Sequence, residues 1–189
     1  MDEKEITRFS DQIWVTRVSR VNAEKRLLRD ESIVQTANIY YSIITLLASV
    51  YLLKTNNNKA GFFIVGMSIA LTIISLYFKN LNFTSRAISF RDNYTELQKI
   101  EFKLKDKAKT KQDYTELNDE YCDLLKKGEN HITFDYYKAV YYSNQDYKDV
   151  HLTRKIKLGY LLGVLWRIVF IALVFSLPVC VLIVLLQGD

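Results

Sequence analysis

Three long runs of apolar residues interrupt an otherwise charged and polar sequence. They cover residues 37–53, 60–78 and 158–186. Within them, Arg167 is the one charged residue. Each run is about as long as, or longer than, the roughly 17 to 25 apolar residues with which an α-helix crosses a bilayer. The pattern therefore predicts three transmembrane helices.

Polar side chains recur at helical spacing inside the first two runs. The first run carries Asn38, Ser42, Thr45 and Ser49, and the second carries Ser68, Thr72 and Ser75. A five-residue turn at 55–59 makes these two helices antiparallel neighbours. Their polar stripes either pack the helices together through small and hydroxylated side chains, or line a water-filled path in an oligomer. Taken alone, the stripes favour packing.

The third run has irregularities of its own. If its span effectively begins at Trp166, this side chain lies in the interfacial aromatic belt and Arg167 extends to the headgroups. If the span begins near Leu158, Arg167 faces a water-filled path and favours anions. Pro178 removes a helical hydrogen-bond donor, so we expect it to free the Val174 carbonyl and to kink the helix.

The remaining segments also read as helices. No Pro or Gly occurs before Gly61, which predicts one helix from the N-terminal arm into the first span. Apolar spacing predicts three further helices. The first runs from Asn82 or Thr84 to Lys107, the second ends at Lys127 before Gly128, and the third covers 132–142. A polar link follows at 144–150.

The predicted fold is an all-α membrane protein in which a transmembrane hairpin continues into a cytoplasmic helical bundle. We expect a cytoplasmic helical arm, a transmembrane hairpin, a cytoplasmic helical region and a third transmembrane helix. Their boundaries are 1–36, 37–79 (with spans 37–54 and 60–79), 80–157 and 158–186.

Basic residues near the span ends predict the orientation. Lys and Arg gather before the first span, after the second and before the third, whereas the 55–59 turn carries Lys59 with Lys54 at its edge. Because basic residues favour the cytoplasmic side, we expect the N-terminus and the central region inside and the C-terminus outside. The charged segment 1–30 does not resemble a cleaved secretory signal. The net charge of +5 fits these membrane flanks better than direct nucleic-acid binding.

Candidate catalytic chemistry is sparse. The sequence shows no phosphate-binding glycine loop, no zinc-ligand spacing and no nucleophile elbow. Glu129, His131 and Asp135 lie near one another and could serve acid–base chemistry or a metal. The stronger interpretation is structural, with Gly128 ending one helix and Asn130 capping the next. We therefore predict no enzymatic activity, no metal and no cofactor.

Several local motifs, in this order, resemble the SLATT family of two-span effector domains that accompany SMODS and SLOG proteins in bacterial conflict systems. They are Glu24-Lys-Arg-Leu-Leu28, Tyr40-Tyr-Ser42, Arg86-Ala-Ile-Ser-Phe-Arg-Asp-Asn-Tyr94, Leu97-Gln-Lys99, Tyr121-Cys-Asp-Leu-Leu125 and Glu129-Asn-His131. The resemblance covers roughly residues 15 to 145. The third apolar run is additional to the two-span pattern.

The resemblance implies a homo-oligomeric pore-forming effector of antiviral defence, which permeabilises the bacterial inner membrane in an abortive infection when an upstream sensor triggers it. That sensor would be a nucleotidyltransferase, a SLOG-type protein or a reverse transcriptase. With this resemblance, pore lining becomes the favoured role of the stripes. A membrane-anchored scaffold or sensor that recruits a cytosolic partner is the alternative. Candidate signal-receiving residues, which could bind a nucleotide messenger, are Arg86, Arg91, Lys99, Glu129 and His131.

Overall fold

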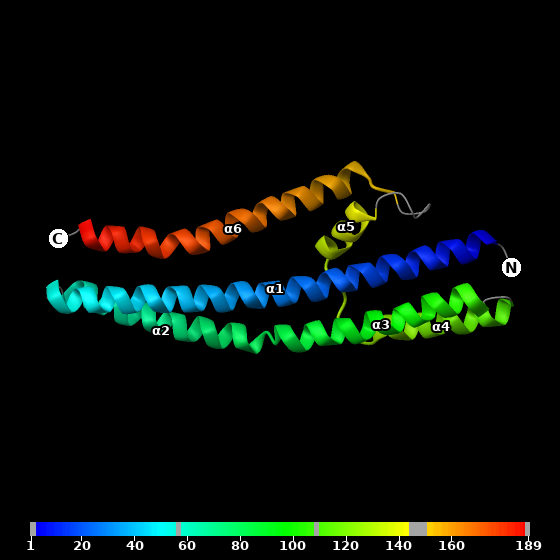
Figure 1. The fold of residues 1–189 in the computed structure, drawn as a ribbon, viewed down its shortest axis with the longest axis horizontal. Coiled ribbons are helices and arrows are strands. Elements are labelled where there is room, and N and C mark those ends of the chain that lie inside the picture. Colours follow the sequence, from blue (N-terminus) through cyan, green and yellow to red (C-terminus); the bar gives the residue numbers. More distant parts are fainter. Residues whose placement is uncertain (1–2, 56–57, 108–109, 144–150, 188–189) are drawn as a thin grey trace. The chain divides into compact units, whose positions relative to one another are not determined.

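A computed structural model describes residues 3–55, 58–107, 110–143 and 151–187 and shows helices throughout these segments (Figure 1). Their bounds are α1 Glu3–Thr55, α2 Asn58–Asn80, α3 Phe83–Lys107, α4 Lys111–Lys126, α5 Thr133–Tyr142 and α6 Arg154–Gln187. Within the described residues there is no strand, which confirms the predicted all-α class. The polar link predicted at 144–150 lies outside the described residues.

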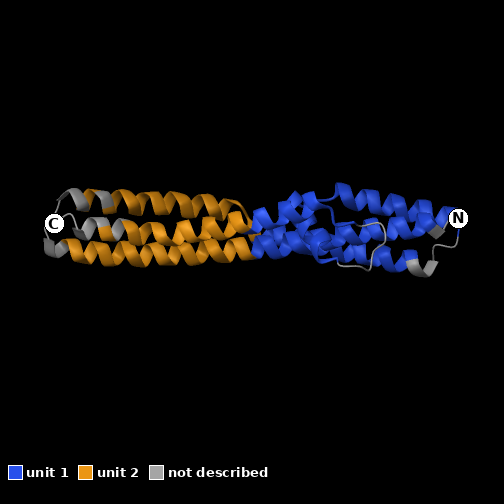
Figure 2. Cartoon of the chain, turned by 90° about the horizontal axis from the view of Figure 1, so that it is seen from above, with its two compact units in different colours: residues 1–28, 84–164 blue, residues 29–83, 165–189 orange. Residues whose placement is uncertain are grey.

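The chain forms two compact units (Figure 2). Unit 1 comprises residues 1–28 and 84–164, and unit 2 comprises residues 29–83 and 165–189. The long helix α1 contributes residues to both, as does α6. The 53 residues of α1 contain neither Gly nor Pro, so no backbone feature interrupts the helix, as the sequence predicted.

Unit 2 brings together the second half of α1, the whole of α2 and most of α6. Three helices of the described chain are long and apolar enough to cross a membrane by length and composition, as the sequence predicted. Leu46, Phe62, Ile69 and Leu173 are among their exposed apolar side chains. Such a surface is typical of helices whose outer faces meet lipid.

Unit 1 has an apolar core between α1, α3 and α4. Its buried members are Phe9, Ile13, Leu97, Ile100, Leu104, Leu117 and Tyr121. The Phe9 ring makes edge-to-face contacts with Tyr114 and Tyr121, at centroid distances of 5.2 and 5.5 Å. These helices therefore pack as a small soluble bundle does, with one apolar stripe each turned inward.

The ends of α4 and α5 show which predicted capping residues the structure uses. Thr110 caps α4 with a capping box, and Gly128 follows α4 with a φ of 96°, the left-handed conformation predicted for this glycine. The predicted cap of α5 was wrong. The cap is Ile132 instead of Asn130, and Asp135 Oδ2 accepts the Ile132 backbone N–H at 3.2 Å.

Candidate functional site

The two polar stripes lie on α1 and α2 within unit 2. Their members, each exposed or half-buried in the chain, are Asn38, Ser42, Thr45, Ser49, Ser68, Thr72 and Ser75. The stripes meet where Ser75 Oγ lies 2.8 Å from Asn38 Oδ1. The structure thus brings α1 and α2 together as neighbours and leaves much of both polar faces open.

The hydroxyl groups of the stripes donate hydrogen bonds to the backbone of their own helix. Ser42 Oγ lies 2.8 Å from the Asn38 carbonyl oxygen, and Thr72 Oγ1 lies 2.9 Å from the Ser68 carbonyl oxygen. Hydroxyls in the same arrangement, four positions after their acceptor, belong to Thr45, Ser49, Ser68 and Ser75. A hydroxyl bonded in this way needs no donor or acceptor from a second helix. The stripes are therefore compatible with lipid, water or another protein surface.

Pro178 and two tyrosines form a second polar contact in unit 2. Because proline has no amide hydrogen, the Val174 carbonyl loses its helical donor, as the sequence predicted. Tyr41 Oη lies 2.7 Å from this carbonyl oxygen, and Tyr40 Oη lies 3.0 Å from the carbonyl oxygen of Phe175. The Tyr40 and Phe175 rings are 5.4 Å apart. The Tyr41 hydroxyl thus replaces the missing donor, and both tyrosines join α1 to α6.

Arg167 has a carboxylate partner within unit 2. Its Nη2 donates a hydrogen bond to Oδ1 of Asp30 on α1, and the two side chains are 22% and 30% exposed. The sequence had suggested the headgroups or a water-filled path for this guanidinium. The neighbouring Trp166 is 74% exposed, and its predicted place in the interfacial belt stays a prediction.

Arg86 and Glu129 come together in unit 1. Arg86 Nε lies 2.7 Å from Glu129 Oε2, and Nη2 lies 2.5 Å from Oε1, which is a two-pronged ion pair. The hydrogen bond from the guanidinium lowers the pKa of Glu129, and the same bond raises the pKa of Arg86. Two of the candidate signal-receiving residues are therefore bound to each other.

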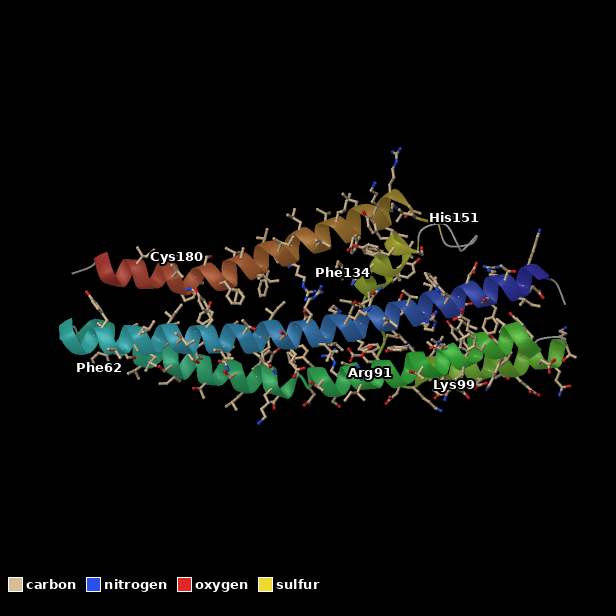
Figure 3. All side chains as sticks on the ribbon, in the orientation of Figure 1. Phe62, Arg91, Lys99, Phe134, His151 and Cys180 are labelled. Carbon is tan, nitrogen blue, oxygen red and sulfur yellow. The ribbon has the colours of Figure 1, made fainter. Side chains whose placement is uncertain are left out.

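Arg91 and Lys99 lie farther along α3 and have other partners (Figure 3). Arg91 Nε and Nη2 lie 2.7 and 2.5 Å from Oε1 of Glu24, and Lys99 Nζ lies 2.6 Å from Oε1 of Glu96. The Glu24 side chain is 7% exposed, whereas that of Arg91 is 55% exposed. A phosphate that bound either basic group would have to compete with a carboxylate of the same unit.

His131 is half-buried and Asp135 is buried, and the two side chains interact electrostatically. Burial and the positive charge of Arg20 lower the pKa of His131. Asp135 is 1% exposed, and Arg26 donates to both of its carboxylate oxygens, with Nε and Nη2 each at 3.0 Å. The Asp135 carboxylate thus holds α5 against α1. Among the described residues, no group of three His, Cys, Asp or Glu side chains is placed to hold a metal ion.

A groove of about 320 Å³ lies between α1 and α5 in unit 1. Its lining comprises Trp14, Val18, Asn22, Lys25, Lys138, Ala139 and Tyr142. The volume is at the small end of the range for ligand pockets. No local sequence signal predicts this groove, because its walls come from segments more than one hundred positions apart.

Two glycines of α6 were not predicted to form a contact, although their spacing in the sequence is a recognisable packing motif. Gly159 and Gly163 are four positions apart, the spacing with which small residues let helices approach closely. A Cβ at Gly163 would lie 2.6 Å from ring atoms of Phe134, and one at Gly159 would lie 2.5 Å from Tyr137 Cε2. Figure 3 shows Phe134 on α5, whose aromatic side chains pack on this glycine face.

Residues 2–185 match the family described as SMODS and SLOG-associating 2TM effector domain family 5. The chain belongs to this SLATT family. No curated protein and no solved structure matches the chain.

The match extends the resemblance beyond residues 15–145. It reaches residue 185 and thus includes almost all of α6, although the family description counts two transmembrane segments. The third apolar helix is therefore part of the matched region. SLATT domains are membrane effectors of conflict systems, and theirs is not a known catalytic fold.

Proposed function

We propose that this SLATT chain is a pore-forming effector that oligomerises in the bacterial inner membrane and permeabilises it when an upstream sensor signals infection. The observation that carries the proposal is the pair of polar stripes, which stay largely exposed on neighbouring helices of a single chain. Hydroxyls that are already bonded to their own backbone tolerate a resting state in lipid or protein and still have free lone pairs for water.

Asn38 strengthens the argument for an oligomer. Its side chain is exposed inside the first apolar run, and a primary amide has donors and acceptors that hydrocarbon cannot satisfy. The Ser75 hydroxyl lies 2.8 Å from its oxygen and shares one proton between this oxygen and the Leu71 carbonyl oxygen. Water in a pore, or a neighbouring copy of the chain, would accept from its amide hydrogens. A ring of copies around a pore would supply both kinds of acceptor, the water and the neighbouring chain.

We place the membrane spans at 37–54, 60–79 and within 158–186, with the N-terminus and residues 80–157 in the cytoplasm. The distribution of Lys and Arg supports this orientation. The upstream partner in this proposal is a nucleotidyltransferase, a SLOG-type sensor or a reverse transcriptase. Unit 1 would receive the signal, and Arg86, Arg91, Lys99, Glu129 and His131 remain candidates for that role. No catalytic step is part of the proposed mechanism.

The test is membrane potential in cells that carry the neighbouring genes and are infected with phage. We expect the wild-type chain to depolarise these cells, as read with a potential-sensitive dye. The combined substitution of Asn38→Leu, Ser42→Leu and Thr45→Leu should abolish depolarisation while the protein still inserts and assembles. Ile39→Leu with Ile43→Leu is the matched control, because both side chains are exposed on the same helix outside the stripe.

Two outcomes contradict the proposal. One is a wild-type chain that protects cells at full membrane potential, and the other is a stripe variant that depolarises them as the wild type does. Loss of assembly in the stripe variant would instead assign the stripe to helix packing.

The groove in unit 1 favours a second candidate, a membrane-anchored scaffold or sensor that recruits a cytosolic partner. Its lysines and aromatic rings offer a contact surface that needs no pore. Under this alternative, unit 1 tethered to the membrane by an unrelated anchor would retain protection. Under the pore proposal it would lose protection.

A further inference from the structure

The helix α6 is longer than a bilayer is thick. Its 34 residues correspond to about 51 Å at ~1.5 Å per residue, whereas the hydrocarbon core is ~30 Å thick. Its apolar run of about 29 residues exceeds the ~20 that span this core by about nine. At the ~20° tilt typical of membrane helices, this run still rises about 41 Å, so part of the apolar helix extends beyond the hydrocarbon.

Side chains near the middle of α6 show which end protrudes. The ion pair between Arg167 and Asp30 and the exposed ring of Trp166 are features of the interface between lipid and water. With this interface at 166–167, the residues from Ile168 onward fill the span. The protruding segment is then 154–165, on the side assigned above to the cytoplasm, so the inference rests on the proposed membrane placement.

The protruding segment has two different faces. One face is occupied by the chain itself, because Gly159 and Gly163 contact the aromatic rings of α5 and Tyr160 stacks on Phe134. The opposite face is a row of leucines at successive steps of three, one and three. Leu158, Leu161, Leu162 and Leu165 are 59%, 45%, 55% and 57% exposed.

Neither water nor lipid suits this leucine row. Outside the hydrocarbon, a continuous row of leucine side chains that the chain itself leaves about half exposed is typical of an interaction surface. Lipid is an unsuitable partner because α5, which packs on the other face of the same turns, is fixed by the buried ion pair between Asp135 and Arg26. Charged groups of this kind belong outside the hydrocarbon.

We propose that the leucine row docks on the same row of a second copy of this chain. Positions three and four apart are the a, d and e positions of a heptad, the spacing by which parallel helices associate. The bilayer already holds α6 of every copy parallel and at the same depth, so identical leucines meet in register. The basic residues Arg154, Lys155 and Lys157 precede the row and lie where anionic headgroups can offset their mutual repulsion.

Site-specific cross-linking in native membranes tests this pairing. In a full-length chain with Cys122→Ser and Cys180→Ala, single substitutions Leu161→Cys and Leu165→Cys are treated with a short bismaleimide. We expect a product of twice the chain's mass, formed about fivefold or more faster than from the control Trp166→Cys, which lies about a quarter turn from the centre of the row and is more exposed. Equal rates at the three positions overturn the proposal.

Other occupants give other results. If lipid covers the row, a lipid-soluble maleimide labels Leu161→Cys and no cross-linked pair forms. If a different protein covers it, the adduct has a mass other than twice that of the chain. Either result overturns the pairing of two copies.

A charge-exchange experiment provides a second test that does not depend on cysteine. Leu161→Glu and Leu161→Lys each place like charges opposite one another, so each variant alone should lose self-association. Differently tagged Leu161→Glu and Leu161→Lys chains expressed together should co-purify again. A Leu161→Glu variant that self-associates as well as the wild type overturns the proposal.

These readouts separate the inference from the proposed function. Cross-linking at the leucine row without depolarisation upholds the pairing and counts against the pore. Depolarisation without cross-linking at the row upholds the pore and removes the pairing.

Discussion

A single missing amide hydrogen explains the most specific contact in unit 2. Pro178 leaves the Val174 carbonyl without its helical donor, and Tyr41 supplies a hydroxyl at 2.7 Å. In hydrocarbon, a bare carbonyl is costly, so the proline and the tyrosine depend on each other. The sequence predicted the freed carbonyl, but the donor lies 133 positions away and no local spacing points to it.

This dependence gives a double-mutant prediction. Tyr41→Phe should lower the free energy of unfolding by about 0.6 kcal/mol, and by at most about 1.7 kcal/mol, the range for hydrogen bonds between membrane helices. In a Pro178→Ala background, the helix supplies its own donor, so Tyr41→Phe should cost almost nothing. Denaturant unfolding in mixed micelles measures both costs. Tyr51→Phe, an exposed position of the same helix, is the control, and equal costs of Tyr41→Phe in the two backgrounds would refute the link.

Among the elements, α6 packs against α5 through two glycines, beside a hydrogen bond between the Tyr160 and Tyr142 hydroxyls. Gly159 and Gly163 present bare backbone to the α5 rings, so the helix lies closer to α5 than any side chain would permit. A glycine spacing of this kind in a membrane helix usually marks contact between spans. Here the contact is with a short helix of unit 1, built from an aromatic-rich sequence.

Alanine at Gly163 should therefore strain this contact. Its Cβ would lie 2.6 Å from the Phe134 ring, and such overpacking costs about 1–3 kcal/mol. The matched control is Gly66→Ala in α2, where nothing lies within 4 Å and alanine should be neutral or stabilise the helix by about 0.5–1 kcal/mol. Thermal unfolding in detergent compares them. Similar melting temperatures for the two variants would contradict the packing.

The helices of this chain were more predictable from the sequence than the contacts between them. Helical periodicity, the absence of Gly and Pro before Gly61 and the terminator Gly128 were sufficient to predict the helices. The cap of α5 was mispredicted because the Asp135 carboxylate reaches back to Ile132. The ion pair between Arg26 and Asp135 joins residues 109 positions apart. Periodicity identifies which face of a helix is buried, but it does not identify the residue of another segment that contacts this face.

At the scale of the whole molecule, an odd number of spans places the two ends of the chain on opposite sides of the membrane. Basic residues flank the cytoplasmic ends of the proposed spans, and the segment 55–59 has fewer of them. If α6 crossed no membrane, its end would lie beside unit 1 on the same side. The location of the C-terminal residues therefore decides whether this SLATT chain has two spans or three.

Cysteine accessibility in spheroplasts tests this topology. In the background with Cys122→Ser and Cys180→Ala, a membrane-impermeant maleimide should label Asn57→Cys and Gly188→Cys in intact cells, because the proposed topology assigns both sequence positions to the outer side. Lys99→Cys replaces a side chain that is 60% exposed in unit 1, and it should react only after permeabilisation. Labelling of Gly188→Cys that also requires permeabilisation would leave α6 on the cytoplasmic side. That result would remove the third span and, with it, the membrane placement on which the pairing of leucine rows depends.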